Sequence, residues 1–101
     1  MDPHPVNMDL VAMLATHWID HPSACDTPEG IRSWWVRAEW RVSHESVMAA
    51  LGWLLNRGFI ESVTAADGRV RFRRHERRRA SEFDELVRHI RHDDGPCRGG
   101  D

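Results

Sequence analysis

The sequence has no lysine, no tyrosine, only two cysteines and no long hydrophobic run. The longest stretches without charge lie near residues 10–16 and 46–56, and both are too short to cross a bilayer, which takes roughly 20 apolar residues. We therefore expect no membrane-spanning segment and no membrane partner. The first nine residues show neither a basic start nor an apolar signal core, so we expect a cytoplasmic protein.

The two cysteines, Cys25 and Cys97, lie far apart and form no CxxC pair, which argues against a disulfide-rich fold and favours reduced thiols. Without lysine, all 14 basic residues are arginines, whose planar guanidinium suits phosphate or carboxylate. Residues 69–79 hold seven of them against one acid, Glu76. This stretch carries +6, so the rest of the chain carries −8 within the net charge of −2.

Catalytic patterns are scarce. The sequence contains no glycine-rich phosphate loop and no convincing pair of carboxylates. Ser43, His44 and Glu45 have the residue types of a hydrolase triad. Adjacent residues on a helix, however, point about 100° apart and cannot form the required chain of hydrogen bonds. We therefore expect no catalytic residue, no cofactor and no enzymatic activity.

Two groups of residues could be considered as metal ligands. They are His17, His21 and Cys25, and His89, His92 and Asp93. Neither group supplies four ligands at a known spacing, and Pro22 should end the helix that would carry the first group. We expect exposed histidines and no metal site.

Two helices are expected in the N-terminal part of the chain. Asn7 can cap a helix over about residues 8–20, which His21-Pro22 then ends. Its apolar stripe consists of Leu10, Val11, Leu14 and Trp18. A second helix over about residues 28–38 follows the capping sequence Asp26-Thr27-Pro28-Glu29. Its apolar stripe consists of Ile31, Trp34, Trp35 and Ala38.

The third helix has the clearest pattern in the sequence. Ser43 can cap it, and Gly58 lies where a left-handed residue would close it. Its apolar face consists of Val47, Ala50, Leu51, Leu54 and Leu55. Residues 59–63 and 69–74 then predict two strands joined by a turn over 64–68. In the second strand, alternation places Val70 and Phe72 inward and Arg69, Arg71 and Arg73 outward.

A fourth helix is expected over about residues 80–92, with Asp84 and Arg88 spaced to pair. Its apolar stripe is Phe83, Leu86, Val87 and Ile90. This stripe could form a dimer or cover the core of the monomer, and the sequence leaves both open. The chain length favours one domain over 8–92, preceded by an arm at 1–7 and followed by a disordered tail at 93–101.

The segment around the third helix resembles a known family. Val42-Ser43, Glu45, Val47, Ala50-Leu51, Leu54, Gly58 and Ile60 fit the run VS-x-E-x-V-x-x-A-L-x-x-L-x-x-x-G-x-I. That run is typical of small bacterial winged-helix transcription regulators. The resemblance implies a mostly helical α+β fold: a three-helix core, a two-stranded antiparallel wing and an additional C-terminal helix. Trp40 departs from the family, because a leucine usually stands three positions before the capping serine.

The resemblance also implies a way of binding duplex DNA. The third helix would face the bases with His44, Glu45, Met48 and Ala49, and the wing would touch phosphates. The phosphate residues would be Arg69, Arg71, Arg73 and Arg74. The exposed side of this helix carries one acid and no cation, so the wing must supply the attraction to phosphate. We favour a DNA-binding transcriptional regulator on this basis.

A protein partner is the alternative. The strip on the third helix that could bind one consists of Ala49, Gly52, Trp53 and Asn56. Glycine inside a helix costs roughly 1 kcal/mol relative to alanine, so Gly52 indicates a close approach by another group. Five tryptophans in a small chain also favour an interface. The strip could equally be covered by the fourth helix or the N-terminal arm of the same chain.

Overall fold

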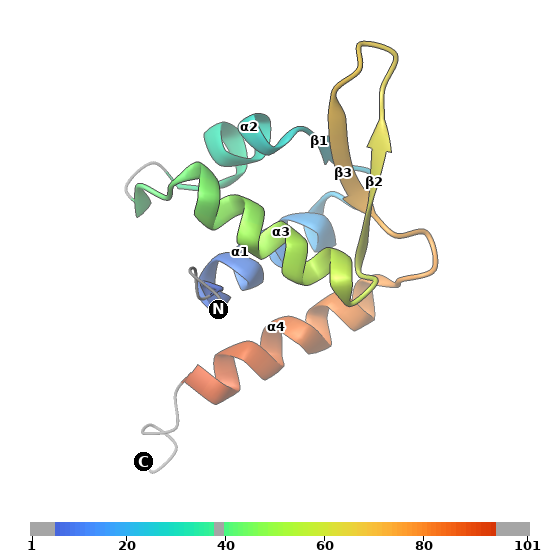
Figure 1. Cartoon of the computed structure of the whole chain (residues 1–101). Helices are drawn as coiled ribbons and strands as arrows, with labels where there is room; N and C mark the ends of the chain where they lie inside the picture. Colours follow the sequence, from blue (N-terminus) through green and yellow to red (C-terminus); the bar gives the residue numbers. More distant parts are fainter. Residues whose placement is uncertain (1–5, 38–39, 95–101) are drawn as a thin grey trace.

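A computed structural model describes residues 6–37 and 40–94 of the chain. The described part is an α+β structure with a three-stranded antiparallel sheet (Figure 1). The elements follow the order α1 (Met8–Asp20), β1 (Cys25–Asp26), α2 (Pro28–Gly30), η1 (Ile31–Trp35), α3 (His44–Asn56), β2 (Ile60–Thr64), β3 (Val70–Arg74) and α4 (Ala80–Asp94). Among the described residues, no helix has both the length and the apolar character that crossing a bilayer requires.

The expected helix starts are confirmed by their capping hydrogen bonds. The Asn7 side chain accepts from the backbone N–H of Leu10 at 3.2 Å, and Ser43 Oγ accepts from Ser46 N–H at 3.1 Å. At the start of α2, Thr27 Oγ1 accepts from Gly30 N–H at 3.1 Å. These bonds satisfy amides that have no partner within the helix, so the polar residue before each apolar stripe fixes where the helix begins.

The second helix differs from its prediction. It ends at Trp35 instead of residue 38, and its last turn, η1, is a π-helix; Ala38 lies outside the described residues. A π-helix has i→i+5 hydrogen bonds, so the i, i+3, i+4 stripe does not stay on one face. Ile31 is fully buried, whereas Trp34 is 82% exposed.

Trp35 turns inward and joins an aromatic cluster at the end of α1. Its ring stacks on His17 with centroids 3.8 Å apart and meets Trp18 edge-on at 4.7 Å. Trp18 is fully buried and its indole N–H donates to the Ala24 carbonyl at 3.0 Å. Burial and the neighbouring His21 lower the pKa of His17 below its usual 6.5. The tryptophans are thus divided between the core and the surface.

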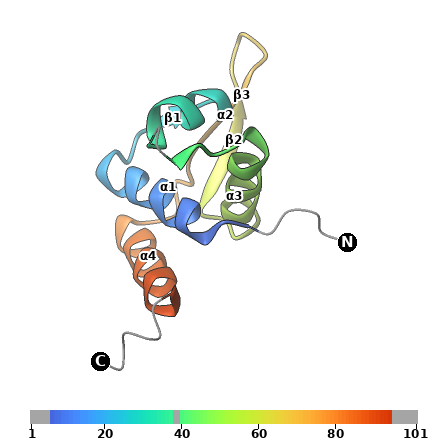
Figure 2. The ribbon, with the colours of Figure 1, turned by 90° about the vertical axis from the view of Figure 1, so that its left-hand side faces the viewer.

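Helix α4 covers the core of its own chain. It packs mainly along α1, and Figures 1 and 2 place α1 between α4 and α2. Phe83, Val87 and Ile90 are buried and Leu86 is half-buried. The Phe83 ring meets Phe59 edge-on at 5.3 Å. The stripe therefore packs inside the monomer.

One ion pair of α4 matches its prediction, and the C-terminal end of the helix does not. Arg88 pairs with Asp84 at 3.1 Å, as their spacing predicted. The helix runs to Asp94, two residues beyond the prediction, so the start of the expected disordered tail at residue 93 is wrong. Residues 95–101 lie outside the described part of the chain.

The α3 helix buries Val47, Ala50, Leu51 and Leu54, as predicted. Leu55 was placed on the same face and is 41% exposed, because it lies at the flank of that face. The helix closes before Gly58, whose φ of 75° is the left-handed conformation that glycine adopts without strain.

The sheet has the strand order β1-β3-β2, so the two-stranded prediction missed β1. This strand is only two residues long, and it pairs Cys25 with Arg73 and Asp26 with Phe72. The predicted hairpin is confirmed: β2 lies one residue later than predicted, and β3 starts one residue later and ends at the predicted residue. Phe72 is buried as expected, but Val70 is 43% exposed. Val70 pairs with Thr64 near the hairpin tip, which extends beyond the helices (Figure 1).

Candidate functional site

A groove of about 300 Å³ lies where the starts of α2 and α3 meet the start of β3. The residues that line it are Thr27, Pro28, Glu29, His44, Met48, Arg69 and Val70. It joins His44 and Met48, predicted to face bases, to Arg69, predicted to hold phosphate. The other two base-facing candidates, Glu45 and Ala49, do not line this groove.

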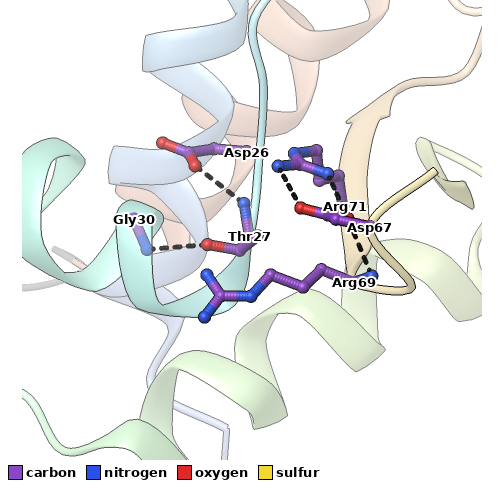
Figure 3. A network of polar contacts seen from close by, with 6 residues as sticks. All are labelled: Asp26, Thr27, Gly30, Asp67, Arg69 and Arg71. Carbon is purple, nitrogen blue, oxygen red and sulfur yellow. Dashed lines mark hydrogen bonds and ion pairs between the residues drawn. The ribbon is translucent and has the colours of Figure 1, made fainter. Parts of the chain in front are cut away.

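Asp67 organises the turn of the hairpin, as Figure 3 shows. The Arg71 guanidinium donates to both Asp67 carboxylate oxygens, at 3.3 and 3.2 Å, and the Arg69 backbone N–H donates to one of them at 3.0 Å. Hydrogen bonding by Arg71 lowers the pKa of Asp67. The Arg69 side chain forms no ion pair within the described part of the chain and extends from the turn toward the first turn of α2 (Figure 3).

The four hairpin arginines do not share one environment. Arg73 pairs across the strands with Glu61 at 2.7 Å, and Arg71 is held by Asp67. Arg74 lies two residues after the buried Phe72, so alternation places it on the inner face, where it is half-buried. Only Arg69 is both without an ion pair and in the groove.

A second groove of about 390 Å³ follows the end of η1 and the segment before α3. Arg32, Arg37 and Arg41 line it together with Ser33, Val36 and Val42. All three arginines are exposed and form no ion pair with the described residues. No pattern in the sequence predicted this cluster. The only signal would have been their position around the loop between two helices, because they form no charge run.

Arg41 has a positive backbone φ of 50°. Every other non-glycine residue in the described ranges has a negative φ. A left-handed conformation costs a residue with a Cβ about 1 kcal/mol. Strained residues of this kind persist where the surrounding structure holds them, and they are enriched at functional sites. The second groove is therefore lined by a residue whose backbone conformation is strained, which supports it as a candidate functional site.

The α3 strip that was the alternative protein interface is open at its glycine. A Cβ added at Gly52 would meet nothing within 4 Å, so no close intrachain contact requires glycine there. Trp53 is half-buried, with the Arg57 guanidinium 4.0 Å above its ring. Asn56 is exposed and Ala49 is half-buried.

The remaining candidates have structural partners. His17 and His21 lie close, with ring centroids 4.7 Å apart, but His17 stacks on Trp35. Within residues 6–37 and 40–94, no three His, Cys, Asp or Glu side chains gather as metal ligands would. The side chains of His92 and Asp93 lie outside the described part. Ser43 Oγ is engaged as the α3 cap.

Arg69 shares its groove with His44 and Met48 of α3, and the second groove lies beside the segment that leads into α3, a helix whose first turns carry no arginine of their own. Among the described residues, Glu29 and Glu45 are exposed acids nearby in sequence. The arrangement can hold an extended anion along the start of the helix. Comparisons with models of protein families, with curated proteins and with solved structures gave no match to this chain.

Proposed function

We propose that this protein binds duplex DNA as a small transcriptional regulator of winged-helix architecture. In this proposal α1, the α2–η1 helix and α3 form the three-helix core, and the β2–β3 hairpin is the wing. The element order and the antiparallel pairing of β1 with β3 support this arrangement. The proposal gives the protein a binding role and no catalytic step.

The observation that carries the proposal is a set of arginines near the start of α3 that form no ion pair with a described residue. Arg69 lies in one groove, and Arg32, Arg37 and Arg41 line the other. Phosphate contacts supply a large share of the affinity for duplex DNA, and guanidinium binds phosphate with two parallel hydrogen bonds. These four side chains would bind the phosphate backbone of the DNA, and His44 and Met48 would face its bases.

The paired arginines of the hairpin are compatible with this role. Arg71 and Arg73 form ion pairs whose members are partly exposed to solvent. Such pairs contribute roughly 0–1 kcal/mol, so a phosphate can replace the carboxylate partner at small cost. The wing would then add contacts beyond those of the two grooves.

Titration of fluorescein-labelled mixed-sequence duplexes at 50 and 200 mM salt tests the proposal. We expect micromolar or tighter binding at low salt. With roughly four phosphate contacts, affinity should fall about 100-fold between the two conditions, because bound counterions are released. Absence of binding at 50 mM salt, or binding that does not respond to salt, would contradict the proposal.

The open surface at Gly52 favours a second candidate, a protein-interaction adaptor of the same architecture that does not bind DNA. A partner could approach the α3 backbone closely there, with Trp53 beside it as an aromatic anchor. In this case Gly52→Arg would abolish binding to the partner, and the DNA titration would show no complex for the unchanged protein.

The stability of Gly52→Ala shows whether the strip is open in solution. We expect the free energy of unfolding to rise by about 1 kcal/mol, because alanine is the better helix former and its Cβ meets no atom. In a domain of this size that corresponds to a Tm about 4–8 °C higher by calorimetry. A lower Tm would mean that this strip is closed by the chain itself.

A further inference from the structure

A third groove, of about 550 Å³, is lined by α1, the end of η1, the segment before α3 and α4. Its apolar wall comes from Met13, Trp35 and Trp40. Arg37 and Arg91 also line it, and neither has an ion-pair partner in the described ranges. Its volume lies within the range of sites that hold small organic molecules, roughly 300–1,000 Å³.

The chemistry of this groove favours one class of ligand. Trp40 is 39% exposed, and Trp35 is supported from within by its stacking on His17. Two such rings offer flat apolar surface that a planar ring can stack on. Among the described lining residues the acid is Asp9, so the two arginines give this described lining an excess of one positive charge.

We propose that this groove binds a small aromatic carboxylate. Its ring would lie against the tryptophans and Met13, and its carboxylate would bridge Arg37 and Arg91. Guanidinium matches a carboxylate with paired, charge-assisted hydrogen bonds, whereas a neutral ring would leave both arginines without a partner.

The same ligand would oppose DNA binding, a consequence that rests on the function proposed above. Arg37 lines both this groove and the phosphate groove formed with Arg32 and Arg41. A carboxylate on Arg37 would compete with phosphate for that guanidinium and place a negative charge beside it. The effect is reciprocal, so DNA would weaken ligand binding by the same factor.

The ligand site can be tested with 2-naphthoate, followed through the tryptophan indole N–H signals in ¹⁵N–¹H spectra of the full chain. We expect the Trp35 and Trp40 signals to shift while that of the outward-facing Trp34 does not. A ligand of this size should bind with a dissociation constant on the order of 0.1 mM. The neutral isostere 2-naphthalenemethanol should bind at least about tenfold more weakly, because it lacks the carboxylate.

Two variants of α4 give the matched comparison. Arg91→Gln should weaken 2-naphthoate binding about tenfold, since it removes one charge-assisted contact. Arg88→Gln removes the same charge from the same helix but lies outside the groove, and its affinity for 2-naphthoate should be unchanged. Equal binding of the neutral isostere, equal effects of the two variants, or no indole shift at millimolar ligand would overturn the site.

Duplex titration with and without 2-naphthoate tests this inference separately from the proposed function. At a 2-naphthoate concentration that saturates the unchanged protein, duplex affinity should fall about tenfold in the unchanged protein and clearly less in Arg91→Gln, because the variant is then only partly occupied. An unchanged duplex affinity would overturn the competition at Arg37. Absence of any duplex binding alongside Arg91-dependent ligand binding would remove the proposed function and support the ligand site alone.

Discussion

Duplex affinity is expected to fall about 100-fold when Arg32, Arg37 and Arg41 are replaced together by alanine. Each lost phosphate contact should cost roughly 1 kcal/mol, and 3 kcal/mol corresponds to about two decades in the dissociation constant. The slope of log affinity against log salt should also become shallower by about 2.7, because three fewer counterions are released. Fluorescence anisotropy at several salt concentrations measures both quantities.

The control is a triple variant with the same change in net charge, Arg77→Ala/Arg79→Ala/Arg88→Ala. Residues 77 and 79 flank Arg78, whose side chain donates to the Arg57 and Gly58 carbonyls at the far end of α3. Their loss should change duplex affinity less than about threefold. Equal losses for the two triple variants would mean that net charge, rather than the groove beside α3, determines binding.

The second large effect is expected for stability. Phe83→Ala should lower the free energy of unfolding by about 3–5 kcal/mol, because the ring is fully buried against Phe59 and its loss leaves a cavity. A domain of this size has a total stability of only about 5–15 kcal/mol. Urea unfolding followed by circular dichroism measures the loss.

The same measurement tests whether α4 belongs to the monomer core. The exposed Glu85→Ala on the same helix should change stability by less than about 0.5 kcal/mol. The unfolding midpoint of the unchanged protein should be the same at 1 and 100 µM. A midpoint that rises with concentration, together with a stable folded Phe83→Ala monomer, would show instead that the α4 stripe forms a dimer.

Local chemistry made much of the fold predictable from the sequence. Asn7 and Ser43 each stand directly before an apolar stripe, and their side chains bind the first free amides of α1 and α3. Phe83, Val87 and Ile90 recur at the helical period, which identifies α4 and its buried face. These signals depend only on residues within one turn of each other.

The missed features depend on contacts between distant segments. A two-residue strand such as β1 has no alternation to detect, and it exists because β3 lies beside it. Val70 alternates correctly with Phe72, but the core ends before it reaches the hairpin tip. The π-turn of η1 moves Trp34 into solvent and Trp35 onto His17, and a periodicity of 3.6 cannot anticipate that change.

The candidate site was predicted in part. His44, Met48 and Arg69 were each proposed to contact DNA, and they meet in one groove. The sequence placed the positive charge in residues 69–79, where Arg71 and Arg73 are engaged by acids that only the folded hairpin brings near. The Arg32, Arg37 and Arg41 cluster combines a residue of η1 with two residues from the segments after η1 and before α3, and no charge run in the sequence indicates it.

Because the backbone at Arg41 is left-handed, thermal stability and anion binding favour different residues at this position. Glycine would adopt this conformation freely, so a screen for heat resistance alone would favour Arg41→Gly. Such an Arg41→Gly variant would unfold at a higher temperature, but it would lack one of the three guanidinium groups of the groove. Engineering of this protein should therefore score anion affinity and melting together.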